Sequence, residues 1–362
     1  MPKKIVFAID TNTAGGGERV IATLANYMSK KGYETFLLNS DSSSAFFPLD
    51  DKVKVCKMHL DRERSGRIGR FIAKYLYLRR FFKQQRPDAA AAFLFNMEAP
   101  VILAGLSTHT RVFTSVRNAA WTYPYRERLF RKIFYPRIAG VVFQSTAVRQ
   151  YKDFRKLTNA AVIMNPLEDD AGERAKPVPY ADRRDIIVSA GRLEKQKNHK
   201  MTILAFSGIC GEFPEYELHI YGEGSLRNEL SRLISDLHLE DRVFLEGAVP
   251  GAISKNRDAK LFVLSSDYEG FPNALAEAMA YGIPAISTDF DTGAASELIR
   301  DGENGWLVGV GDVNGLTEKM RRALSMGEQT DGIAEECVKV YDTIRADAVC
   351  RRWEEFFFPE DI

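Results

Sequence analysis

The sequence has 362 residues, of which 45% are hydrophobic and 27% charged, a length and composition typical of a globular protein with two domains. No apolar run approaches the ~20 residues that a membrane-spanning helix needs, and we expect no signal peptide at the N-terminus. The four cysteines have no metal-ligand spacing, which is typical of reduced thiols in the cytoplasm.

The net charge of +1 conceals an asymmetry between the two halves. Residues 1–160 contain 28 basic and 12 acidic residues, a net charge of +16, whereas the rest contains 22 basic and 37 acidic residues, a net charge of −15. Such a division indicates an anionic partner for the first half. Nucleic acid, a membrane surface and a phosphorylated substrate all fit this pattern.

Short apolar runs alternate with amphipathic segments along the first half, which is the pattern of a parallel sheet covered by helices. A strand at residues 5–9 leads into a Gly-rich loop at 11–17 and a helix at 18–30. Further strands are predicted at residues 34–39, 52–56, 89–94, 112–115, 140–144 and 161–164.

The polar, Pro-containing stretch 168–185 predicts an interdomain linker, after which the pattern resumes. Strands are predicted at residues 186–190, 217–221, 243–245, 261–264 and 284–287. Helices are predicted at residues 198–210, 225–237, 274–281, 314–325 and 330–358.

The expected fold class is α/β, with two doubly wound Rossmann-like domains facing a central cleft. We predict an N-terminal domain at residues 1–166 and a C-terminal domain at residues 167–345. A helix at 346–362 is expected to pack back on the N-terminal domain. In such folds ligands bind at the carboxyl ends of the strands.

Three glycine-containing corners follow predicted strands, at residues 15–19, 191–198 and 221–225. Free backbone amides at a helix N-terminus bind anions. The first corner does not match the dinucleotide fingerprint, because Val20 stands where the third glycine should be. In the second, Arg192 and Lys197 could converge on a diphosphate, and Asn198 could cap a helix. Each corner alone could equally be a solvated loop.

The segment 265–280 carries the most specific pattern, since Glu269 precedes a predicted helix and Glu277 lies one turn inside it. Such carboxylates can accept hydrogen bonds from sugar hydroxyls, while the first backbone N–H groups of the helix bind phosphate oxygens. The alternative is an acidic turn that complements the helix dipole.

These motifs together resemble family 4 retaining glycosyltransferases of the GT-B fold. The resemblance rests on Gly-Arg-Leu-x-x-x-Lys-Asn at residues 191–198, Gly-x-Gly at 222–224, and Glu-Gly-Phe-Pro-x-x-x-x-Glu-Ala-Met-Ala-x-Gly-x-Pro at 269–284. The N-terminal glycine loop and the segment 301–308 fit as well. The resemblance covers almost the whole chain and is weak for the particular sugar. It implies that the N-terminal domain (1–166) binds the acceptor and that the C-terminal domain (167–345) binds the nucleotide sugar.

The resemblance implies catalytic roles for Arg192 and Lys197 on the donor diphosphate and for Glu269 at the donor sugar. It implies that Glu277 binds the ribose. The further donor-binding residues that it implies are Gly16, Gly17, Gly222, Val249, Gly270, Phe271, Pro272, Asn273, Ala274 and Leu275. Stabilisation of the departing diphosphate would be the main catalytic effect, and no dedicated protein base is required.

One position departs from many relatives, which have a His near the donor sugar where this sequence has Arg117 and Asn118. An arginine cannot act as a base at neutral pH. These two residues are therefore interpreted as candidates for acceptor or phosphate binding. Asp289-Phe290-Asp291 imitates a metal-binding Asp-x-Asp motif, but its position suits a loop of the family better. We expect no metal and no cofactor.

Residues 62–86 contain nine basic residues and one acid, with apolar residues at helical spacing. A basic amphipathic helix of this kind can lie on an anionic membrane. The alternative is an ordinary domain helix with a solvated basic face. We expect peripheral attachment at the cytoplasmic face of the membrane, and no nucleic acid as partner.

The sequence thus predicts a hexosyltransferase that moves a hexose or N-acetylhexosamine from a UDP-sugar, without metal, to a lipid-linked or other surface-glycan acceptor. Capsule and lipopolysaccharide are the glycans considered. A UDP-sugar 2-epimerase on a similar fold and a non-enzymatic nucleotide or nucleic-acid binder are the alternatives.

Overall fold

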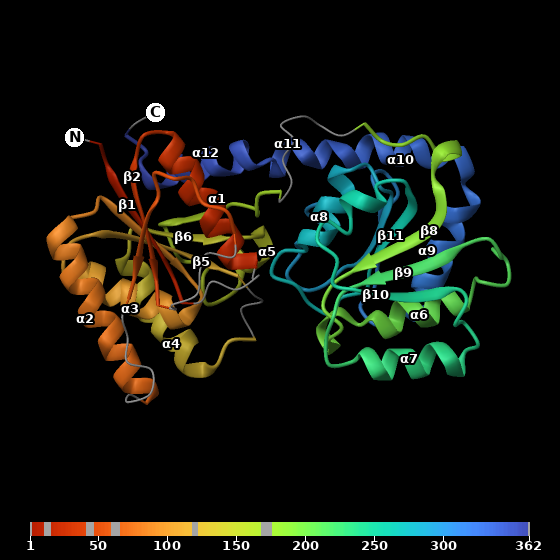
Figure 1. Cartoon of the computed structure of the whole chain (residues 1–362), viewed down its shortest axis with the longest axis horizontal. Helices are drawn as coiled ribbons and strands as arrows, with labels where there is room; N and C mark the ends of the chain where they lie inside the picture. The colour runs from red at the N-terminus through yellow and green to blue at the C-terminus, as the bar shows by residue number, and fades with distance from the viewer. Residues whose placement is uncertain are drawn as a thin grey trace. The chain divides into compact units, whose positions relative to one another are not determined.

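The computed structural model describes residues 2–10, 16–40, 47–58, 66–117, 122–167 and 176–360. The chain divides into two compact units (Figure 1). Unit 1 comprises Met1–Glu168 together with Ala346–Ile362, and unit 2 comprises Asp169–Arg345.

Unit 1 is built on a seven-stranded sheet whose described strand pairs are all parallel, in the order β3-β2-β1-β4-β5-β6-β7. Its central strands are buried on both faces, as parallel strands covered by helices must be. The strands are β1 (Lys4–Ile9), β2 (Glu34–Asn39), β3 (Lys54–Lys57), β4 (Ala89–Phe93), β5 (Arg111–Val116), β6 (Gly140–Phe143) and β7 (Ala160–Val162).

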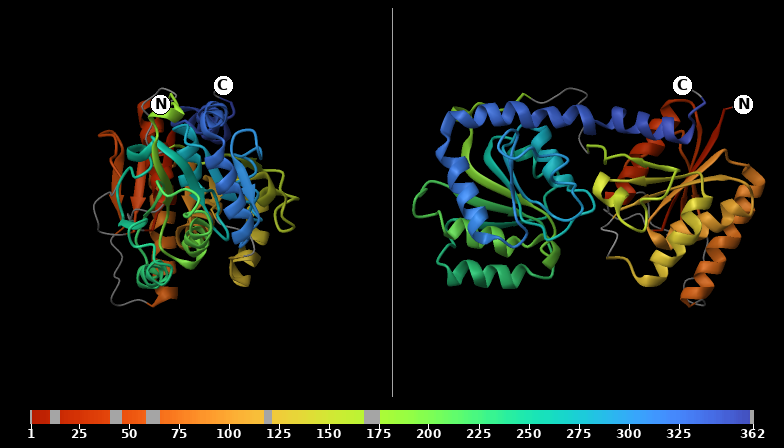
Figure 2. Two further views of the ribbon diagram at one scale, coloured as in Figure 1. Left: turned by 90° about the vertical axis from the view of Figure 1, so that its right-hand side faces the viewer. Right: turned by 180° about the vertical axis from the view of Figure 1, so that it is seen from behind.

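Helices cover both faces of this sheet (Figure 2). On one face α2, α3 and α4 share a core with the sheet, and on the other face α1 and α12 do so. The helices of unit 1 are α1 (Gly16–Lys30), α2 (Arg67–Gln85), α3 (Phe95–Leu106), α4 (Tyr125–Phe134), α5 (Thr146–Gln150) and α12 (Ala346–Phe357).

Unit 2 repeats the arrangement with a six-stranded parallel sheet in the order β10-β9-β8-β11-β12-β13. Its strands are β8 (Arg184–Ala190), β9 (Glu217–Tyr221), β10 (Val243–Gly247), β11 (Ala259–Leu264), β12 (Ala285–Thr288) and β13 (Trp306–Val308). Its helices are α6 (His199–Ser207), α7 (Arg227–Asp236), α8 (Asn273–Ala280), α9 (Val313–Ser325), α10 (Thr330–Cys337) and α11 (Tyr341–Ile344). Both units thus have the strand order of a doubly wound fold, and the predicted fold class is confirmed.

The structure differs from the sequence-based elements in several places. The predicted helix 330–358 is interrupted, because extended backbone at Arg345 ends α11 before α12 begins. The short strand β13 and the helices α3, α4 and α5 were not predicted. No helix in the described part of the chain combines the length and the apolarity that crossing a membrane requires.

Candidate functional site

Three loops follow neighbouring strands of unit 2 at the carboxyl edge of the sheet. We call residues 191–198 the β8 loop, residues 222–226 the β9 loop and residues 265–272 the β11 loop. Because β8 pairs with both β9 and β11, the three loops adjoin one another. This edge is where doubly wound sheets bind their ligands.

Hydrogen bonds join the β8 and β11 loops directly. The backbone N–H of Asp267 donates to the Gln196 carbonyl at 2.8 Å, and the Asn198 amide donates to the Asp267 carboxylate at 2.8 Å. The Ser265 hydroxyl lies 3.0 Å from the Lys197 carbonyl. Asn198 also caps α6, since its side chain accepts a hydrogen bond from Met201 N–H, as predicted. These contacts fix the backbone on which the charged side chains stand.

The β8 and β9 loops approach so closely that glycine is required. Gly222 has a φ of +148°, and a Cβ atom there would lie 1.9 Å from the Gly191 carbonyl oxygen. At Gly224 the Leu193 carbonyl oxygen would lie 2.4 Å from an added Cβ. The Glu194 carboxylate accepts hydrogen bonds from the backbone and hydroxyl of Ser225, which lower its pKa. The glycines therefore serve close packing of the two loops.

The carboxylate of Glu269 is buried at the centre of this edge, with 6% of the residue exposed. It accepts a charge-assisted bond from Lys197 Nζ at 2.5 Å, one from the Ser266 hydroxyl at 2.6 Å and one from Gln196 Nε2 at 3.2 Å. A buried carboxylate is tolerated when it is paired and hydrogen-bonded in this way. The structure thus brings together Lys197 and Glu269, two residues that the sequence analysis selected separately.

Gln196 was not selected from the sequence, yet it connects the charged residues. Its amide nitrogen donates to Glu269 and to the Tyr268 carbonyl, and its amide oxygen accepts from Arg192 Nη2 at 3.3 Å. Arg192 itself is exposed. A Gln next to a charged loop residue is too common for the sequence alone to reveal this role.

The β11 loop ends at α8, whose first turn offers backbone donors. Gly270, Phe271 and Pro272 form a buried turn. Asn273 N–H donates to the Phe271 carbonyl at 3.0 Å.

Ala274 and Leu275 have no backbone acceptor for their N–H groups among the described residues, and they lie at the positive end of the helix dipole. Glu277 is half-buried within α8. Val249 is half-buried and follows β10, whose terminal Gly247 accepts the Gly222 N–H at 2.8 Å.

A buried histidine, His199, contacts the backbone at the start of the β8 loop. His199 is 3% exposed, its Nε2 lies 3.2 Å from the Gly191 carbonyl oxygen, and its Nδ1 lies 3.3 Å from the Ser189 hydroxyl. Burial lowers its pKa from 6.5 to about 4. The ring is therefore neutral at pH 7, so Nε2 can donate to the carbonyl without burying a charge.

The remaining predicted residues belong to unit 1. Gly16 and Gly17 begin α1, and a Cβ at Gly17 would make only ordinary contacts. Arg117 follows β5, donates to Asn165 Oδ1 and stacks 4.1 Å from the Phe93 ring centre. Its Nε atom is buried without a hydrogen-bond partner, and burial lowers the pKa of the guanidinium to about 9. Asn118 lies outside the described residues.

The described residues contain no group of three or more His, Cys, Asp or Glu side chains arranged to bind a metal. Asp289 and Asp291 are both exposed, and Phe290 between them is buried.

Comparison with solved structures identifies the fold. HepE from Anabaena, solved in complex with UDP, superposes with a TM-score of 0.81 at 17% sequence identity, over 97% of this chain and 98% of that one. The two doubly wound units are those of a GT-B glycosyltransferase.

Two family models match the sequence and together span most of it. "Glycosyl transferases group 1" matches residues 172–339, and "Glycosyltransferase Family 4" matches residues 14–166. The chain belongs to glycosyltransferase family 4, and the predicted resemblance is confirmed.

Curated relatives cover nearly the full length of the chain. One is the Campylobacter jejuni α-1,4-N-acetyl-D-galactosaminyltransferase acting on GalNAc-α-(1→4)-GalNAc-α-(1→3)-diNAcBac-PP-undecaprenol, 27% identical over 89% of each chain. Another is the amylovoran biosynthesis glycosyltransferase AmsD of Erwinia amylovora, 22% identical over 97% of this chain and 99% of that protein. These relatives act in the biosynthesis of bacterial glycans.

Proposed function

We propose that this glycosyltransferase moves a hexose or N-acetylhexosamine from a UDP-sugar to a lipid-linked or other surface-glycan acceptor, with retention of the anomeric configuration and without a metal. The observation that carries the proposal is the cluster at the carboxyl edge of the unit 2 sheet. There a paired Lys197 and Glu269, an exposed Arg192 and two free α8 amides occur together.

The donor diphosphate binds beside Arg192 and Lys197, with the α8 amides of Ala274 and Leu275 as further donors. Two cations and a helix N-terminus neutralise the charge that grows on the leaving nucleotide diphosphate as the glycosidic bond breaks. Glu277 binds the ribose, and Gly222 and Val249 lie beside the nucleobase.

Binding of the donor exchanges partners within the site. Lys197 leaves Glu269 for the phosphate, and Glu269 Oε1, which keeps its bond from the Ser266 hydroxyl, accepts a second hydrogen bond from a sugar hydroxyl. Ser266 and Gln196 keep the carboxylate in place during this exchange, because their bonds do not involve Lys197. No protein base is required, since a phosphate oxygen of the leaving group receives the proton of the acceptor hydroxyl.

With a lipid-linked acceptor, unit 1 meets an anionic membrane at the cytoplasmic face. Support comes from α2, where Ile68, Ile72 and Leu76 form an exposed apolar row along a basic helix. Lys74 does not share the solvated basic face, since it is 8% exposed and paired with Asp10. Residues 62–65 of the proposed membrane segment lie outside the described residues. Arg117 and Asn118 bind a phosphate of donor or acceptor.

The test is a thermal-shift screen against nucleotide sugars, followed by a transfer assay with the stabilising donor and lipid-linked acceptors. Stabilisation by a UDP-sugar, with acceptor-dependent UDP release and an unchanged anomeric configuration by NMR, is expected. Conversion of the UDP-sugar without acceptor would instead identify an epimerase. Loss of transfer on chelation would contradict the metal-free mechanism.

A further inference from the structure

Unit 1 contains a cavity of about 700 Å³ that none of the donor-binding residues line. It opens at the carboxyl edge of the unit 1 sheet, where Asp10 follows β1 and Ser40 follows β2. Its walls are the first turns of α2, α3 and α4. Both the volume and the position are those of a small-molecule site in a doubly wound domain.

The floor of the cavity is a buried ion pair. Lys74 Nζ is paired with the Asp10 carboxylate and donates to the Asn96 carbonyl at 3.3 Å. The Ser40 hydroxyl donates to Asp10 Oδ1 at 2.5 Å. Because one cation meets one carboxylate, the floor is electrically balanced and its polar groups are held in fixed directions.

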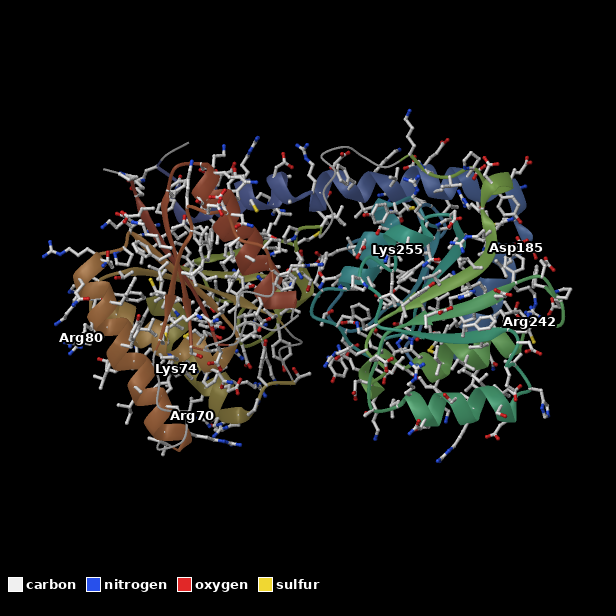
Figure 3. The ribbon with its side chains drawn as sticks, viewed as in Figure 1. Arg70, Lys74, Arg80, Asp185, Arg242 and Lys255 are labelled. Carbon is white, nitrogen blue, oxygen red and sulfur yellow. The ribbon has the colours of Figure 1, made fainter. Side chains whose placement is uncertain are left out.

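The rim of the cavity is positive. Arg67 and Arg70 stand on α2, and Arg126 stands on α4 (Figure 3 labels Arg70 and Lys74, one helical turn apart). In the part of the chain that the structure describes, no carboxylate pairs with any of these three arginines. The other acid of the lining, Glu127, is engaged by Arg131 at 3.7 Å. The rim therefore presents three guanidinium groups that no carboxylate of the described residues neutralises, and guanidinium forks match phosphate oxygens.

The lining of the cavity also contains apolar side chains. Phe71 and Phe95 line it, and so does Ile68, which is 77% exposed. Ile68 begins the exposed row that Ile72 (49% exposed) and Leu76 (55% exposed) continue along α2. A ligand that places anionic oxygens among the arginines can therefore lay an attached hydrocarbon along this row.

We propose that this cavity binds the phosphate or diphosphate group of an amphiphilic ligand, the lipid-linked acceptor, with the lipid chain directed along the α2 row. The identity of the ligand as the acceptor rests on the proposed function, whereas the phosphate chemistry rests on the cavity alone. A phospholipid headgroup offers the same chemistry without a sugar-bearing diphosphate.

The test is calorimetric titration of the full-length protein with farnesyl diphosphate, inorganic pyrophosphate and UDP. Arg70→Ala and Arg126→Ala are compared with Arg80→Ala, an exposed arginine of α2 that does not line the cavity. All three variants remove one surface charge. Farnesyl diphosphate is expected to bind more tightly than pyrophosphate, and each cavity variant is expected to lose about tenfold in affinity, the scale of one charge-assisted bond. Arg80→Ala is expected to stay within about twofold of wild type.

Equal losses in Arg70→Ala and Arg80→Ala would overturn the proposal, because binding would then follow diffuse surface charge. Tighter binding to phosphatidylglycerol vesicles than to farnesyl diphosphate, with the same dependence on Arg70, would overturn the acceptor and assign the cavity to a phospholipid.

UDP affinity unchanged in every variant is the expected control. If UDP failed to bind while farnesyl diphosphate still bound in an Arg70-dependent way, the result would contradict the proposed donor site and support the proposed cavity site.

Discussion

The charged residues of the two units are organised in opposite ways. At the unit 2 edge, Lys197 and Glu269 neutralise each other, and Gln196 and Ser266 complete the hydrogen bonds. At the unit 1 cavity, the balanced pair of Lys74 and Asp10 forms the floor, and the cations of the rim have no internal partner in the described residues.

This difference indicates which kind of ligand each region binds. In the hydrogen-bonded network of unit 2 the charged groups are oriented before a ligand binds, and the ligand must replace one of their partners. Groups oriented in advance are suited to stabilising a transition state. An uncompensated positive rim attracts anions over a longer range and tolerates variation in their geometry. The first arrangement suits a reacting group, and the second suits the holding of a substrate remote from the reaction.

The largest effect is expected from Lys197→Ala. Loss of the cation that stabilises the leaving diphosphate lowers kcat by about 10² to 10³-fold. Steady-state kinetics of UDP release measures this, with Lys195→Ala, an exposed lysine of the same loop, as the control. Because Lys197 and Glu269 act in one step, the double alanine variant is expected to lose little more than either single variant. Multiplicative losses would show that the two residues act independently.

Arg131→Met is expected to destabilise unit 1 by about 3 to 5 kcal/mol, because Glu98 would remain buried without its cation. Arg131 is 2% exposed and Glu98 is 1% exposed. Their ion pair, 3.1 Å from Arg131 Nη2 to Glu98 Oε2, joins α4 to α3. Urea denaturation measures the change. The control is Arg128→Ala, whose partly exposed pair with Asp153 should contribute about 1 kcal/mol or less. A small effect at Arg131 would mean that the buried pair does not anchor α4.

His199 should make stability depend on pH. Its pKa is 6.5 in the unfolded chain and about 4 in the folded protein, so between these values the unfolded state binds the extra proton. Stability is therefore expected to fall as the pH falls from about 6.5 to 4, by up to about 3 kcal/mol, and to change no further below that from this group. The difference between wild type and His199→Asn across this pH range isolates the effect. A pH-independent difference would contradict the neutral buried ring.

The smallest effect is expected from Gln196→Ala, which removes one neutral-donor bond to Glu269 and one acceptor from Arg192. A loss of about tenfold in kcat/KM, with UDP affinity nearly unchanged, would show that Gln196 positions the Glu269 carboxylate. Gln196→Glu should be worse, because a second carboxylate would face Glu269. An active Gln196→Glu variant would show that Gln196 does not position Glu269.

Much of the fold followed from patterns in the sequence. Short continuous apolar runs predicted most strands within a few residues, since burial on both faces of a parallel sheet demands continuous apolar stretches. The strand β13 was missed because its three residues are too short to show a period. The break before α12 was missed because no proline or glycine marks Arg345, and the extended backbone there separates two helices that pack in different units.

The sequence by itself determined the glycosyltransferase family, the donor motifs and the charge asymmetry, because these reside in residue types at fixed spacings along the chain. Only the tertiary structure decided that Lys197 meets Glu269, that Gln196 links them to Arg192, and that Lys74 is buried on Asp10. The contacts of Lys197 and Gln196 with Glu269, and of Lys74 with Asp10, join residues of distant segments. The pairing of parallel strands brings the ends of such segments together.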